Sequence, residues 1–123
     1  MPNLQLEEKS LHNKLFVTDA GTVTLLNGSI DKTTKVVTTT YTILDTDWMI
    51  FANSNSGAFT ITLPSATGRI GREYIIVRTN AGAGEDITIQ TINGGNVILD
   101  NRYDSVYVVS DGSGWYICSG YGI

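Results

Sequence analysis

The feature that most constrains the fold is a regular alternation of short β-prone segments with turn residues. After residue 40, runs of Val, Ile, Thr and Tyr are separated by clusters of Gly, Asn, Asp and Ser, for example at residues 53–57 and 110–114. The clusters recur at intervals of roughly 8–12 residues, a spacing typical of sandwiches and barrels. No segment in this region has the period of an amphipathic helix. The sequence therefore predicts an all-β domain over residues 38–123, an antiparallel β-sandwich or a jelly-roll-like fold.

One predicted strand, at residues 48–52, has two apolar faces. Trp48, Ile50 and Ala52 alternate with Met49 and Phe51. Such a strand is either central in its sheet or presses one face on a neighbouring subunit. Charged residues make up only 16% of the chain, below the roughly 25% of an average soluble protein. Together these features predict a homo-oligomer, in which sister copies cover apolar surface.

Residues 1–37 have a different pattern and are predicted to form an N-terminal arm that attaches the domain to a larger particle. Leu4, Leu11 and Leu15 fall on one helical face, and Phe16 follows them. These four residues are the candidate attachment segment, either as a short helix or as an extended arm. The residues after Phe16 also fit a hairpin around residues 19–21. An ordinary first hairpin of the domain is therefore the alternative.

Composition argues against several classes of function. The net charge is −4, and no basic stripe is present, so nucleic-acid binding is not expected. No apolar run approaches the ~20 residues of a membrane span, and the first residues lack the order of a signal peptide. Synthesis in the cytoplasm, without membrane insertion, is expected. With Cys118 as the single cysteine, neither an intrachain disulfide nor a metal site is expected, and no phosphate-binding loop indicates a cofactor.

The residues that catalysis requires are scarce. His12 is the single histidine and lies in the predicted arm, so a Ser-His-Asp or Cys-His arrangement is not expected. Carboxylate pairs that would suit glycoside hydrolysis occur at Asp45 and Asp47, at Glu85 and Asp86, and at Asp100 and Asp104. Each pair stands among turn residues, where Asp usually caps the backbone. We therefore expect no catalytic residues, and a glycan hydrolase remains a lesser alternative.

Aromatic side chains are the best candidates for binding. Tyr103 and Tyr121 stand in turn-like or terminal segments and are predicted to present flat faces to sugar rings. Trp48 and Trp115 stand in alternating strands and are predicted to lie in the core. Cys118 is predicted to be a small hydrophobic residue of the core or of a subunit interface. Solvated surface positions are expected for the arginines of the domain, which are Arg69, Arg72, Arg78 and Arg102.

A longer pattern of strand and turn residues runs through most of the domain. It consists of residues 41–43, 47–53, 61–66, 71–78, 87–89, 106–112 and 115–117. This pattern resembles the small β-modules of phage fibre proteins, including head fibres and the distal parts of tail fibres. The resemblance covers about residues 38–118. It implies a trimeric virion component that is displayed on the capsid or the tail.

The length of the chain refines this expectation. A compact domain of this size spans only a few nanometres, which favours a short head fibre or a capsid decoration. The expected partners are sister copies, a capsid or tail protein, and host cell-surface carbohydrate. A tail fibre or a receptor-binding module at the tail tip is the alternative within the same family, and a carbohydrate-binding module without a virion role is the alternative outside it.

Overall fold

In the computed structural model, residues 30–123 are described. This part of the chain consists of strands and turns without a helix, so the all-β class predicted from the sequence is confirmed. It therefore contains no helix that is long and apolar enough to cross a membrane. The candidate attachment residues Leu4, Leu11, Leu15 and Phe16 lie outside the described residues.

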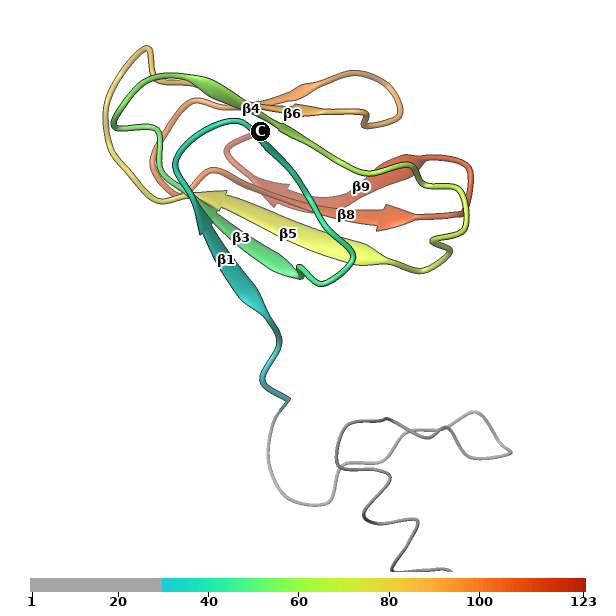
Figure 1. The fold of residues 1–123 in the computed structure, drawn as a ribbon. Helices are drawn as coiled ribbons and strands as arrows, with labels where there is room; N and C mark the ends of the chain where they lie inside the picture. Colours follow the sequence, from blue (N-terminus) through green and yellow to red (C-terminus); the bar gives the residue numbers. More distant parts are fainter. Residues whose placement is uncertain (1–29) are drawn as a thin grey trace, which may run out of the picture. The chain divides into compact units, whose positions relative to one another are not determined.

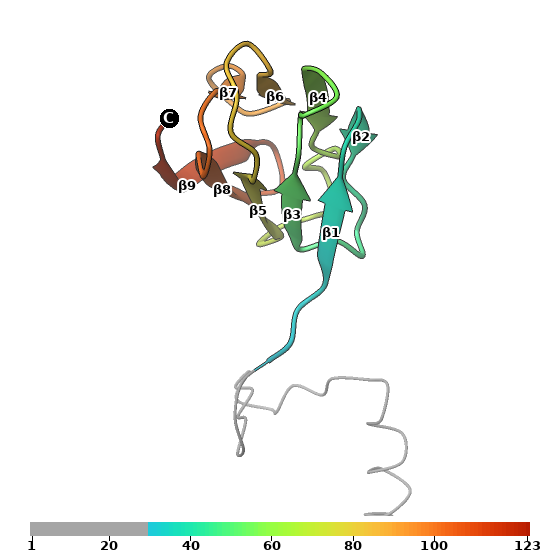
Figure 2. The ribbon, with the colours of Figure 1, turned by 90° about the vertical axis from the view of Figure 1, so that its left-hand side faces the viewer.

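The strands of residues 30–123 form two sheets. Their bounds are β1 (Thr34–Val37), β2 (Tyr41–Thr42), β3 (Met49–Ala52), β4 (Phe59–Thr62), β5 (Glu73–Arg78), β6 (Ile87–Gln90), β7 (Val97–Leu99), β8 (Ser105–Ser110) and β9 (Trp115–Tyr121). One sheet has the order β1-β3-β5-β8-β9 and the other the order β2-β4-β6-β7. Figure 2 shows the two sheets as separate layers.

The first six strands alternate between the sheets, so β1–β2, β3–β4 and β5–β6 each make one turn around the core. Because the chain returns to each sheet in the same direction, β1, β3 and β5 pair in parallel, and so do β2, β4 and β6. After β6 the chain reverses. β7 pairs with β6, β8 with β5 and β9 with β8, each in antiparallel fashion. The sheets are therefore mixed, whereas the sequence predicted antiparallel ones. The turn residues that suggested hairpins mark crossings between sheets in the first six strands.

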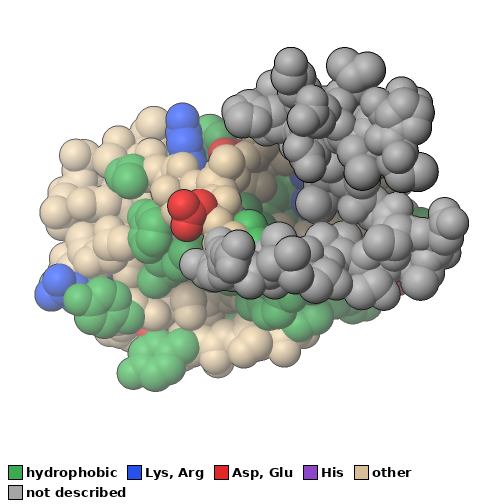
Figure 3. Space-filling model, turned by 90° about the horizontal axis from the view of Figure 1, so that it is seen from below, with side chains coloured by type: hydrophobic (Ala, Val, Ile, Leu, Met, Phe, Trp, Pro, Cys, Tyr) green, Lys and Arg blue, Asp and Glu red, His purple; other side chains and the backbone are tan. Residues whose placement is uncertain are grey.

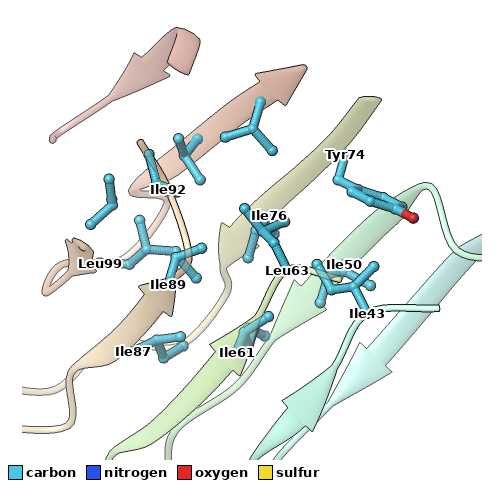
Figure 4. Packing of buried hydrophobic residues seen from close by; sticks show 14 of the residues in the cluster. Ile43, Ile50, Ile61, Leu63, Tyr74, Ile76, Ile87, Ile89, Ile92 and Leu99 are labelled. Carbon is cyan, nitrogen blue, oxygen red and sulfur yellow. The ribbon is translucent and has the colours of Figure 1, made fainter. Parts of the chain in front are cut away.

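The inner faces of both sheets contribute to one cluster of buried apolar side chains. Ile50 and Ile76 come from the five-stranded sheet, and Ile61 and Ile89 from the four-stranded sheet (Figure 4). Trp115 is only 1% exposed, and its indole N–H donates to the Pro64 carbonyl at 2.6 Å. The predicted core position of Trp115 is confirmed.

The strand register collects several loops at one end of the sheets, which we call the pocket end. β5 finishes there at Arg78, β8 starts there at Ser105, and Ser105 pairs with Tyr121 near the end of β9. Residues 79–86, 100–104 and 121–123 therefore lie together. The predicted boundary after residue 37 falls at the end of β1, which pairs with β3; the compact unit itself starts at Lys32.

Candidate binding surfaces

The outer face of the five-stranded sheet is largely apolar. Its exposed and half-buried members, which we call the outer face, are Val36, Met49, Phe51, Ile75, Val77, Tyr107, Val109, Tyr116 and Tyr121. Val36 is the β1 member and is 68% exposed. Figure 3 looks at this sheet from below and shows several patches of apolar side chains on the part of the surface that is not drawn in grey. In the single chain, nothing among the described residues covers this face.

A hydrogen-bonded carboxylate interrupts the outer face at Glu73, the first residue of β5. Its Oε2 accepts from the Tyr107 hydroxyl at 2.5 Å, and its Oε1 accepts from the Trp48 indole at 3.0 Å and the Lys32 ammonium at 3.2 Å. These bonds, the one from Tyr107 first, lower the pKa of Glu73. The Lys32 ammonium also lies 4.2 Å from the centre of the Trp48 ring. Trp48 is half-buried and absent from the buried cluster, so its predicted core position is wrong.

A cavity of about 690 Å³ lies at the pocket end. Its lining residues are 81–84, Asp86 and 100–102; because Ile87 pairs with Leu99, Asp86 lies next to Asp100, and we group residues 81–84 as the first wall and Asp86 with residues 100–102 as the second. Small side chains and glycines form the first wall, whereas carboxylate, amide and guanidinium groups form the second. A smaller cavity of about 450 Å³, lined by Thr91, Asn93, Ser113 and Tyr116 among others, lies at the opposite end of the sheets.

The two tyrosines predicted to contact glycans both lie at the pocket end. Tyr103 is 57% exposed, and the Arg102 guanidinium lies 4.8 Å from the centre of its ring. Tyr121 is 67% exposed and belongs to the outer face. Arg102 lines the cavity, so Tyr103 lies next to a lining residue without being one itself, whereas Tyr121 is on a different element and belongs to the sheet surface.

Tyr103 has an unusual backbone. Its φ is 72°, in the left-handed region that favours glycine. The Tyr103 N–H donates to the Arg78 carbonyl at 2.8 Å, and the Asp104 N–H donates to the Asn101 carbonyl at 3.2 Å. These bonds hold the turn in a conformation that costs a non-glycine residue of order 1–3 kcal/mol.

Arg78, predicted to be solvated, is fully buried at 0% exposure, so that prediction is wrong. One terminal nitrogen donates to the Gly82 carbonyl at 2.8 Å and the other to the Leu99 carbonyl at 3.3 Å. Within residues 30–123, its Nε has no hydrogen-bond partner. The alternation of β5 contained the missed signal, because Arg78 has the same parity as the buried Tyr74 and Ile76.

Most of the carboxylates considered for hydrolysis are bound within the chain. Asp45 pairs with Arg69 at 2.7 Å and with Arg72 at 3.4 Å, and these guanidinium groups, the Arg69 hydrogen bond first, lower its pKa. Asp47 accepts from the Tyr41 hydroxyl at 2.6 Å and the Leu44 N–H at 2.8 Å. Burial and then the Asp47 hydrogen bond raise the pKa of Tyr41 to about 12.

Asp104 also has a structural position. It is buried, and its Oδ2 accepts from the N–H groups of Asp100 at 3.1 Å and Asn101 at 2.8 Å. Asp86 and Asp100 remain as the carboxylates that line the cavity. In the part of the chain that the structure describes, no cluster of three or more His, Cys, Asp or Glu side chains could hold a metal ion. Cys118 is exposed on β9.

No family model matches the chain, and comparison with curated proteins also finds no match.

Proposed function

We propose that this protein is a non-enzymatic structural and adhesive component of a phage particle, most simply a short head fibre or capsid decoration. Its β-domain would be a sandwich that assembles into a homotrimer, and its first residues would attach the trimer to the particle. The observation that carries the proposal is the outer face. It extends over five strands, and a sheet surface of this kind is normally covered by another layer or another subunit.

The charge on the outer face supports burial against sister copies. Burying an unpaired carboxylate is costly, because the ion loses its hydration. Glu73 already accepts hydrogen bonds from Lys32, Trp48 and Tyr107 of its own chain. The neighbouring apolar side chains could therefore pack against another subunit without leaving this carboxylate unpartnered.

The adhesive part of the proposal rests on the pocket end. There, the exposed Tyr103 lies against Arg102, which lines a cavity together with other polar side chains. Three copies on each fibre and many fibres on each particle would bind together, so each site can be weak and still hold a cell surface. A tail fibre or tail-tip receptor-binding module is the second candidate, and this same cavity favours it.

Val36→Lys tests the interface directly. The side chain is 68% exposed in the single chain, so a lysine there leaves the fold intact, whereas a charge on a trimer interface should dissociate it. We expect sedimentation equilibrium to give the mass of three 13.3 kDa chains for the unmodified protein and of one for the variant. Ile70→Lys is the matched control, since Ile70 is 82% exposed but lies in a loop. A strictly monomeric unmodified protein would contradict the proposal.

The virion role is tested separately on purified particles. Antibody labelling and electron cryomicroscopy should locate this chain as short projections on the capsid. Projections only at the tail would favour the second candidate. Absence from the particles would refute a virion role even for a protein that forms trimers.

A further inference from the structure

We infer that the cavity at the pocket end is a binding site for a neutral sugar unit of a surface polysaccharide. This inference rests on the adhesive half of the proposed function and adds to it a site and a ligand class. Three independent features of the described residues point to it. They are a preformed pair of walls, a set of side chains that suits hydroxyl groups, and an exposed aromatic ring that lies against one of the lining residues.

One buried side chain ties the two walls of the cavity together. The Arg78 guanidinium donates to the Gly82 carbonyl in the first wall and to the Leu99 carbonyl next to Asp100 in the second. Asp104 fixes the second wall further by accepting from the N–H groups of Asp100 and Asn101. A preformed site loses little conformational entropy when it binds, which matters for a small and polar ligand.

The second wall presents the donors and acceptors that sugar hydroxyls need. Asp86 and Asp100 are acceptors, the Asn101 amide is both donor and acceptor, and Arg102 is a donor. Asn101 Nδ2 donates to Asp100 Oδ1 at 2.9 Å, and Arg102 Nε donates to the Thr79 carbonyl at 3.2 Å. Both planar groups are thereby oriented, and their remaining polar atoms are available to a ligand.

The charged groups around the cavity favour a neutral sugar over an anionic ligand. Two carboxylates, Asp86 and Asp100, line the cavity together with the single cation Arg102. The buried Arg78 guanidinium supplies a second positive charge behind the wall. Asp104 in the second wall and Glu85 beside Gly82 add two more carboxylates, so the carboxylates around the cavity outnumber the guanidinium groups. An acidic sugar or a phosphate would meet these carboxylates, so a neutral ligand is favoured.

Tyr103 is the exposed aromatic residue next to the lining residue Arg102. The ring is exposed and lies against Arg102, whereas its backbone holds a φ of 72°. A glycine would adopt this conformation without strain, so the fold alone gives no reason for an aromatic residue at this position. An exposed ring beside polar groups is suited to stack on the C–H face of a pyranose.

The site can be tested by NMR titration of the ¹⁵N-labelled full chain. The probes are methyl glycosides of glucose, galactose, mannose, rhamnose and N-acetylglucosamine, with glucuronate and sialic acid as acidic probes. We expect at least one neutral probe to shift the amide signals of Gly82, Gly84 and Asn101 in a saturable way, at millimolar concentration. No shift with any neutral probe, or shifts with the acidic probes alone, would overturn the inference.

Tyr103→Gly separates a binding role from a structural one. We expect affinity for the neutral probe to fall by about tenfold, whereas the melting temperature stays unchanged or rises because the backbone strain is relieved. Thr91→Gly is the matched control, since Thr91 also has a positive φ of 70° but lies at the opposite end. Unchanged affinity in Tyr103→Gly would remove the ring from the site.

Two further results keep the inference distinct from the proposed function. Asp100→Ala should lower the affinity by at least about tenfold, and equal affinity would count against the second wall. A trimer that binds none of the neutral probes would refute this inference alone. A monomer that binds one through these residues would refute the trimer alone.

Discussion

At the scale of single residues, Glu73 links three parts of the domain. Lys32 precedes β1, Trp48 precedes β3 and Tyr107 lies in β8, and all three donate to this one carboxylate. Since the hydrogen bonds lower its pKa from the ordinary value of 4.5, they favour the charged form in the folded state. A lowered pKa contributes stability above the unfolded-state value, and this stability is lost as the pH falls through the folded-state value.

Glu73→Gln should therefore change both stability and its pH dependence. We expect the free energy of unfolding at pH 7 to fall by about 1 kcal/mol, because hydrogen bonds to a charged acceptor become neutral ones. The loss of stability on acidification below pH 4.5 should be smaller in the variant. Asp45 and Asp111 also have lowered pKa values, so some loss should remain. Urea unfolding at a series of pH values and one protein concentration measures both effects; identical acid profiles would contradict the prediction.

Single residues also show where the sequence pattern is enough to predict whether a side chain is buried, and where it is not. The predicted core position of Trp115 is confirmed, because burial follows the two-residue period of a strand. The same period places Arg78 inside, but its charge led to a surface prediction. Trp48 lies just before β3, where the alternation no longer decides burial. The contacts of Tyr103 with Arg102 and the left-handed φ depend on tertiary hydrogen bonds that no local pattern specifies.

At the scale of elements, the C-terminal tail is linked to the turn before β8. Gly122 has a φ of +72°, and a Cβ atom there would overlap the Asp104 carboxylate. Asp104 in turn caps the N–H groups of Asp100 and Asn101. The end of β9 therefore supports the wall of the cavity, through a single close approach that only glycine allows.

Gly122→Ala should loosen this wall. We expect a loss of about 1–3 kcal/mol of stability and faster hydrogen exchange at the amides of Asp100 and Asn101. Gly71→Ala is the control, because Gly71 has a φ of +77° but nothing lies within 4 Å of its would-be Cβ. Equal stability losses in both variants, with unchanged exchange at residues 100 and 101, would mean that backbone strain alone accounts for the effect.

The elements also mark the limit of prediction from sequence. Turn spacing gave the strands and the all-β class, but not the pairing direction. A turn between two strands is compatible both with a hairpin and with a crossing to the opposite sheet. Here every connection from β1 to β6 crosses to the opposite sheet, and so does the one between β7 and β8. The hairpins are β6–β7 and β8–β9. The pairing is decided by which inner faces fit together, which is a property of the whole core.

At the scale of the molecule, each sheet has one edge strand from the start of the domain and one from its end. The last turn is followed by β7, β8 and β9, which extend both sheets, so the edge strands are β1 and β9 in one sheet and β2 and β7 in the other. Edge strands of small β-domains tend to pair with other chains unless they are short or covered. β1, β2 and β7 have four, two and three residues, too few for extensive strand addition, whereas β9 has seven. Among the edges, only β9 is therefore long enough for strand addition, whereas the outer face extends over all five strands of its sheet.

The last prediction separates the domain from its first residues. Among the described residues, every member of the buried cluster lies at or after Val37, and the compact unit spans Lys32–Ile123. A chain of residues 32–123 should therefore unfold cooperatively and still form the trimer, since it keeps the outer face. If residues 1–31 contain the attachment segment, this chain should no longer bind particles that lack the protein, whereas the full chain should bind them. Circular dichroism, sedimentation equilibrium and co-sedimentation with such particles measure the three properties. A shortened chain that folds but is monomeric would move the trimer contacts from the sheet to the first 31 residues.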